Sequence, residues 1–134
     1  MTRTDEKVRY LPQGKPAQIA YTRETAAEGV EQALKLLEGR WKLNILFNLF
    51  GGRVLRFSDL ERAIPAVSQK MLIQQLRQME RDGIVRRIVH HQVPPKVEYA
   101  LTDWGQSLCP ALDALLIWAG QRQAQVLDDE SGET

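Results

Sequence analysis

Pro65 and Ser68 stand close together between two stretches with helical periodicity, and this spacing limits the fold more than any other feature of the chain. Proline lacks a backbone donor and disfavours helical geometry at the residue before it, so a helix that reaches this point must end by Ile64. The hydroxyl of Ser68 can then cap a new helix. The sequence therefore predicts two helices joined by a tight turn.

The helix before the turn is expected to begin at Ser58. In the sequence Ser-Asp-Leu-Glu from Ser58 to Glu61, the hydroxyl can accept a backbone amide while the glutamate reaches back to the amide of the serine. The helix after the turn is expected over residues 69–82, because Gly83 supplies the permissive backbone of a helix end.

The helix over residues 69–82 has two different sides. Leu72, Leu76 and Met79 recur at helical spacing and define its buried side. At about 100° per residue, the opposite face collects mainly polar and cationic residues, with Gln69 at its exposed start. These residues are Lys70, Ile73, Gln74 and Arg77.

Two extended segments follow. Residues 84–91 are rich in β-branched side chains, Pro94 and Pro95 break the run, and residues 96–101 resume it. The sequence therefore predicts a two-stranded ribbon with a proline-containing loop at its tip.

The remaining elements surround this centre. The apolar residues of the segment 25–38 recur at helical spacing and predict an amphipathic helix. Residues 41–50 are too apolar for a helix with one solvent-exposed face and predict a central buried helix. Residues 54–57 can form a short extended segment. Thr102 can cap a long final helix over residues 103–126.

These elements predict one domain over residues 24–126, after a polar N-terminal arm (1–23) and before an acidic, disordered tail (127–134). The chain is expected to be mainly α-helical with a small β-ribbon. The element order is that of a winged helix-turn-helix domain, in which one helix reads the DNA major groove and the ribbon lies beside it.

The charge is segregated along the chain. The whole chain has a net charge of only +1, but residues 53–96 hold nine cationic and four anionic side chains, a net charge of +5. A basic middle between acidic flanks is the pattern expected for contact with DNA phosphates. We expect base reading by Gln69, Lys70, Gln74 and Arg77, and phosphate contacts from Arg56, the amides at Ser58, Arg86, Arg87 and Lys96.

The composition argues against other classes of protein. No apolar run approaches the roughly 20 residues that cross a bilayer, and the first residues lack a signal peptide, so we expect a cytoplasmic protein. One cysteine and two histidines make a structural zinc site improbable, and His90 and His91 are adjacent on a strand, so they point to opposite faces. No nucleophile with a positioned base and no glycine-rich phosphate loop is evident, so we expect no enzyme and no cofactor.

Several short motifs occur in a fixed order between Val30 and Ala119. They are Gly39-Arg40-Trp41-Lys42, Arg56-Phe57-Ser58-Asp59-Leu60, Val67-Ser68-Gln69-Lys70-Met71-Leu72, Gln75-Leu76-Arg77, Asp82-Gly83-Ile84-Val85, Val93-Pro94-Pro95-Lys96-Val97-Glu98-Tyr99 and Leu101-Thr102-Asp103-Trp104-Gly105. These motifs resemble those of the HxlR-type (DUF24) family of bacterial transcription regulators. The resemblance implies a DNA-binding homodimer that is joined through its first and last helices, with Ser68, Gln69, Lys70 and Gln74 at the start of the recognition helix.

One departure from the family bears on redox sensing. Many members resemble redox sensors with a Cys-Pro-Val-Glu pattern ahead of the first helix, where this chain has Glu28-Gly29-Val30-Glu31. Cys109 is the remaining candidate for a redox role, and a small buried apolar residue is the alternative reading of it.

Two alternatives to a simple DNA-binding regulator stay open. The basic face of a winged helix can serve an acidic protein partner, because a fold does not fix a function. A small effector could also bind in a cleft at a dimer interface near Trp104, Leu108 and Trp118. A final helix of about 24 residues would span roughly 36 Å, more than a small domain covers, so its apolar side needs a second chain.

Overall fold

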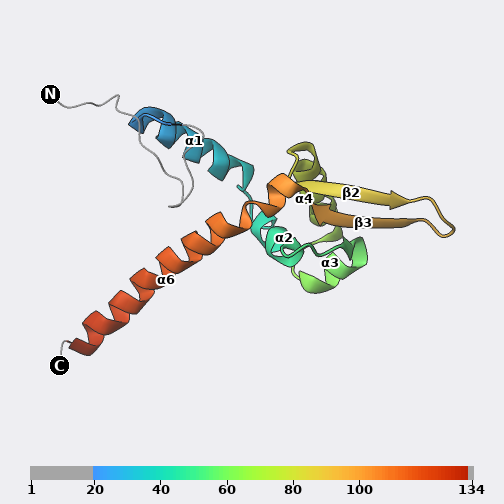
Figure 1. Ribbon diagram of the computed structural model, residues 1–134. Coiled ribbons are helices and arrows are strands. Elements are labelled where there is room, and N and C mark those ends of the chain that lie inside the picture. Colours follow the sequence, from blue (N-terminus) through green and yellow to red (C-terminus); the bar gives the residue numbers. More distant parts are fainter. Residues whose placement is uncertain (1–19, 133–134) are drawn as a thin grey trace. The chain divides into compact units, whose positions relative to one another are not determined.

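The computed structural model describes residues 20–132, with side chains as far as residue 122 (Figure 1). The chain divides into two units, Met1–Gly39 and Arg40–Thr134. In the first unit, helix α1 (Arg23–Leu36) begins earlier than the expected residue 25, because the Thr22 hydroxyl accepts the Thr25 amide at 3.2 Å. Most of the expected N-terminal arm lies outside the described residues.

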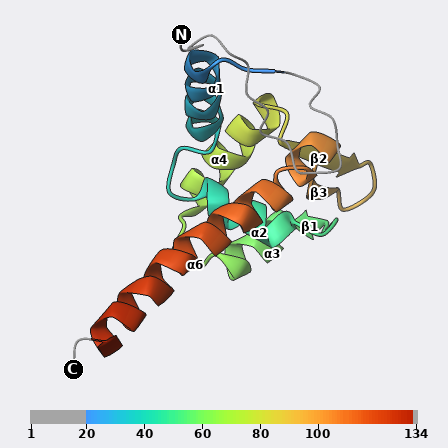
Figure 2. The same cartoon turned by 60° about the vertical axis from the view of Figure 1, so that its left-hand side comes forward.

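The second unit contains the remaining helices and a three-stranded antiparallel sheet of order β1-β3-β2 (Figure 2). This mixture of helices with a small ribbon confirms the expected winged helix-turn-helix architecture. Its elements are α2 (Lys42–Leu49), β1 (Leu55–Arg56), α3 (Phe57–Ala63), α4 (Gln69–Arg81), β2 (Val85–His90), β3 (Lys96–Leu101), α5 (Asp103–Gln106) and α6 (Cys109–Gly132).

The hydrophobic core of the second unit collects one side of each helix. Helix α2 is central, as expected, but Leu43 and Phe47 on its other side are each more than 40% exposed, so the helix is buried along one side only. Lys42 is buried to 2% exposure, which the apolar pattern did not predict. The core residues of the helices are Ile45, Leu46, Leu49, Leu60, Leu72, Leu76, Met79 and Leu112.

The tight turn and the second of its helices are confirmed. The Ser68 hydroxyl accepts the Met71 amide at 3.1 Å at the start of α4. At the other end, Gly83 has a φ of +79°, a left-handed conformation that side chains with a Cβ rarely adopt. Local chemistry therefore sets both ends of α4.

The expected start of the preceding helix is wrong. Helix α3 begins at Phe57, and the Asp59 carboxylate accepts the amide of Arg56 at 2.9 Å, so Asp59 has the role assigned to Glu61. The reason is tertiary, because Leu55 and Arg56 pair with β3 and the helix starts where this short strand ends.

The expected final helix is divided into α5 and α6. Pro110 has no amide hydrogen to donate to the carbonyl of Gln106, so the helical hydrogen bonding is interrupted near this point. Helix α6 continues to Gly132, beyond the expected end at Val126, so it includes most of the segment that was expected to be disordered. In the described part of the chain, no helix has the length and apolar character needed to cross a membrane.

Helix α5 lies against the end of α4 and the start of β2. The Thr102 hydroxyl donates to the carbonyl of Gly83 at 2.6 Å and accepts the amide of Gly105 at 3.0 Å. A Cβ on Gly105 would stand 2.2 Å from the carbonyl oxygen of Ile84. Only glycine allows the two backbones to approach this closely.

We predict that Gly105→Ala lowers the free energy of unfolding by roughly 1–3 kcal/mol, because a backbone carbonyl must shift to admit the methyl group. Gly120→Ala is the matched control, since nothing lies within 4 Å of its Cβ position, and helix propensity should stabilise this variant by about 0.5–1 kcal/mol. Chemical denaturation measures both. Equal stability of the two variants would contradict the close approach.

Candidate nucleic-acid interface

The face of α4 that sequence analysis assigned to base reading is exposed to solvent. Gln69, Lys70, Gln74 and Arg77 all lie on this face, and Ser68 is exposed just before it. With Ile73 and Arg81, these four residues line a shallow depression of about 690 Å³. The structure thus brings the predicted base-reading residues together on one surface.

A second depression, of about 450 Å³, lies between α4 and the sheet. Gln69, Ile73 and Arg77 line both depressions, so the two form one continuous surface. Arg87 and Tyr99 line the second depression from the sheet. This surface of α4 therefore continues onto one face of the wing formed by β2 and β3.

The cations of the wing do not form one group. Arg87 pairs across the ladder with Tyr99, whereas Arg86 pairs with Ala100 and Lys96 pairs with His90. Because side chains alternate along a strand, Arg87 lies on the face that borders α4, and Arg86 and Lys96 lie on the other face. The expected set of Arg86, Arg87 and Lys96 is thus divided between the two faces of the sheet.

Arg56 and Ser58 lie at the junction of β1 and α3, and both are exposed. Asp59 accepts the Arg56 amide at 2.9 Å and also pairs with Arg62. The carboxylate thus occupies the N-terminal end of α3, where the free amides were expected to receive a phosphate. Arg56 remains the cation of this junction.

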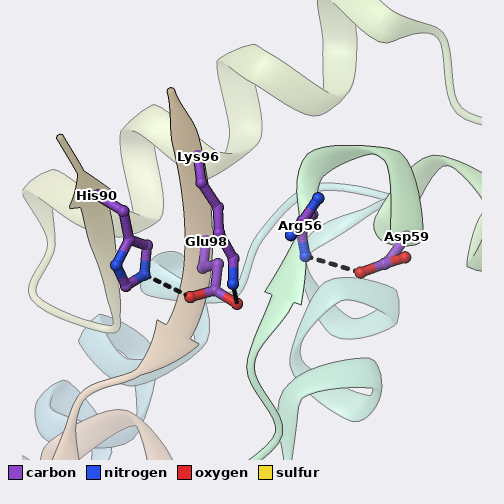
Figure 3. A network of polar contacts seen from close by, with 5 residues as sticks. All are labelled: Arg56, Asp59, His90, Lys96 and Glu98. Atoms are coloured by element: carbon purple, nitrogen blue, oxygen red, sulfur yellow. Dashed lines mark hydrogen bonds and ion pairs between the residues drawn. The ribbon is translucent and has the colours of Figure 1, made fainter. Parts of the chain in front are cut away.

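Glu98 forms the centre of a polar network on the outer face of the wing (Figure 3). Its carboxylate lies 2.6 Å from Nε2 of His90 and 3.6 Å from Nζ of Lys96. The hydrogen bond with His90 holds the pKa of Glu98 below its ordinary value, Lys96 adds to this effect, and partial burial opposes it. Sequence analysis gave Glu98 no role, because only the register of the ladder places His90 on the same face as Lys96 and Glu98.

The other residues considered from the sequence lie apart from this surface. Cys109 is a free, half-buried cysteine at the first residue of α6. Trp118 lines a hollow of about 470 Å³ with Ala119, Gln121 and Arg122, but Trp104 and Leu108 do not belong to it. Among the described residues, no group of three or more His, Cys, Asp and Glu could hold a metal ion.

The element order defines the winged helix-turn-helix class, and comparisons with known proteins agree with this class. Residues 36–126 match the family described as HxlR-like helix-turn-helix, and the chain belongs to this family. The HTH-type transcriptional regulator YtcD of Bacillus subtilis is 47% identical over 100 residues, which cover 75% of this chain and 79% of YtcD.

Solved structures show the same likeness. The redox regulator HypR in its reduced form has a TM-score of 0.66 and 42% identity, covering 75% of this chain and 98% of HypR. A regulator assigned to the MarR family from Enterococcus faecalis V583 has a TM-score of 0.70 and 36% identity, covering 86% of this chain and 99% of its own. The family and the fold expected from the sequence are confirmed.

Proposed function

We propose that this chain is a sequence-specific DNA-binding regulator of transcription that acts as a homodimer on a pseudo-palindromic operator. The observation that carries the proposal is the exposed face of α4, where Gln69, Lys70, Gln74 and Arg77 share one surface. Membership of a family with relatives named as transcriptional regulators supports it.

Helix α4 fits the role of the recognition helix. An α-helix with side chains is about 10–12 Å across, and the major groove of B-DNA is about 12 Å wide. Gln69 and Gln74 can each donate to and accept from adenine, and Lys70 and Arg77 can donate to guanine. The exposed start of α4 is the part of a recognition helix that approaches base edges.

The wing supplies contacts beside the major groove. Arg87 shares a depression with Gln69 and Arg77, so it can bind a phosphate at the edge of the groove that α4 enters. Six-residue strands extend about 20 Å, which lets the outer end of the wing reach the next stretch of backbone or the minor groove. The chain thus offers one base-reading helix and a backbone-contacting ribbon.

Exposed apolar side chains on α6 support the homodimer. Leu115, Leu116, Ile117 and Trp118 are each at least 50% exposed, and four consecutive residues point to all sides of a helix. Helix α1, described by itself, exposes Val30 and Leu34. Apolar surface of this extent favours association, and a second copy of the chain supplies matching helices.

Selection against a randomised duplex library at about 150 mM salt tests the function, because non-specific phosphate attraction is weak at this ionic strength. We expect an inverted repeat with half-sites about 10 base pairs, or a multiple of that, apart. A pool without any enriched sequence would contradict sequence-specific binding and would favour a protein partner for the basic face.

Substitutions on α4 and on the wing should have different effects. Lys70→Ala and Gln74→Ala should relax base preference at one position each, with a loss of about 1–3 kcal/mol on the preferred site. Arg87→Ala should weaken binding to all duplexes alike and reduce the salt dependence of log K by about one unit. Fluorescence anisotropy over a salt series measures both effects, with Gln121→Ala as the exposed control. The division of roles is wrong if the three variants behave alike.

The homodimer is tested by placing a charge on α6. Leu116→Asp should yield a folded monomer in light scattering that binds an inverted repeat at least tenfold more weakly, because the apolar contact between copies is lost. Val54→Asp is the control, since this exposed apolar residue lies outside α1 and α6. A dimer that persists in Leu116→Asp would contradict the role of α6.

A further inference from the structure

The outer end of the wing carries a group of side chains that the base-reading surface does not use. His90 is the last residue of β2, Lys96 is the first residue of β3, and the two pair across the ladder. Figure 3 shows both side chains directed toward the carboxylate of Glu98, which lies two residue pairs further from the tip. The loop of residues 91–95 lies at the end of the hairpin that is away from the helices of this unit (Figure 1).

The three side chains differ in their exposure to solvent. The Glu98 side chain is 18% exposed, that of Lys96 is 28% exposed and that of His90 is 41% exposed. The two basic groups are therefore more accessible to a ligand than the carboxylate. Since its pKa is lowered, Glu98 is ionised at neutral pH and offsets the charge of Lys96.

Other charged groups surround this trio. Arg56 of β1 is the cross-strand partner of Glu98, and Asp59 of α3 accepts the Arg56 amide. Arg86 of β2 lies on the same face of the sheet. Helices α2 and α5, which also contact β3, carry Lys42 and Asp103. His90 and Lys96 are the basic groups at the outer ends of the two strands, and the exposed His91 follows in the loop.

The hydrogen bond to Glu98 defines which nitrogen of His90 carries a proton. An ionised carboxylate only accepts, so the bond of 2.6 Å requires a hydrogen on Nε2. In a neutral ring, Nδ1 then has a lone pair and no hydrogen. A phosphate oxygen is also an acceptor, so it can bind this side of the ring only after Nδ1 has gained a proton.

We propose that the outer end of the wing is a proton-coupled phosphate site, where His90 takes up one proton at Nδ1 and donates it in a hydrogen bond to a DNA backbone phosphate beside Lys96. The proton comes from solvent and returns to it when the DNA leaves. Glu98 is the positioning residue, because it holds the ring through Nε2 and favours the imidazolium. The inference rests on the proposed function.

The charge balance explains how protonation affects affinity. With a neutral His90, the trio of His90, Lys96 and Glu98 has no net charge, whereas with an imidazolium it has a net charge of +1. One further cation at the DNA backbone increases the salt dependence of log K by about 0.9. DNA binding therefore strengthens as the pH falls and His90 takes up its proton.

The test measures the affinity for a selected operator duplex between pH 8 and pH 5.5. The wild type should bind about tenfold more tightly at pH 5.5 than at pH 8, because the imidazolium donates to the phosphate and the neutral ring does not. His90→Gln should bind weakly at both pH values, and His90→Lys should bind tightly at both. His91→Gln, a change at the exposed neighbouring histidine, should keep the wild-type pH profile.

Two further measurements separate this site from a purely structural role of His90. Calorimetry in buffers of different ionisation enthalpy should show proton uptake on DNA binding near pH 7 that His90→Gln abolishes. Glu98→Gln should move the rise in affinity to lower pH. Inorganic phosphate at millimolar concentration, added without DNA, should leave the His90 ring proton signals of the NMR spectrum unchanged, because the site needs the DNA backbone. A saturable shift of these signals would identify a site for free anions and overturn the proposal.

The possible failures are distinguishable. Wild-type protein that binds DNA with the same affinity from pH 8 to pH 5.5 overturns the role of His90 and leaves the proposed function standing. A pH profile retained by His90→Gln does the same. Absence of DNA binding at every pH overturns the proposed function itself.

Discussion

The contact of Thr102 and Gly105 with Gly83 and Ile84 holds α4, the base of the wing and α5 together. The Thr102 hydroxyl bonds the Gly83 carbonyl at 2.6 Å, and its backbone amide donates to the Ile84 carbonyl at 3.0 Å. Gly83 follows α4, Ile84 precedes β2, and Thr102 caps the start of α5. One junction therefore fixes the end of α4, the base of the wing and the start of the C-terminal helices relative to one another. A side chain at position 105 would meet the backbone of Ile84 at this junction.

Beyond this junction, side chains of the wing alternate between the two faces of the sheet, and this alternation decides which cation lies beside α4. Arg87 and Tyr99 face the helix, and their depression joins the surface lined by Gln69 and Arg77. Lys96 lies on the opposite face, where Glu98 offsets its charge. A count of basic residues along the ribbon therefore overstates the charge available beside α4, and cations on the second face serve a different part of the backbone.

Local chemistry made much of the fold predictable, and tertiary contacts explain the failures. Helix α4 begins at the Ser68 cap and ends at Gly83. The hydrogen bond of the cap and the positive φ of the glycine are both local features, so the sequence alone indicated both ends. The start of α3 depends on the pairing of Leu55 and Arg56 with a strand about 40 residues later in the chain, so a capping pattern at Ser58 was misleading. The same applies to Glu98, because its partner His90 is identified only by the register of the ladder.

The small size of the proposed base-reading surface gives a further reason for two copies. In the proposed role of α4, four of its side chains contact base edges, and each well-placed pair contributes about 1–3 kcal/mol of discrimination. Specific binding in a genome requires about 4–10 kcal/mol over non-specific binding, and exposed side chains on one short helix do not all form ideal pairs. Two copies of α4 double the number of readers without any new residue type. The apolar side chains of α6, which a single chain leaves exposed, provide the association that such doubling needs.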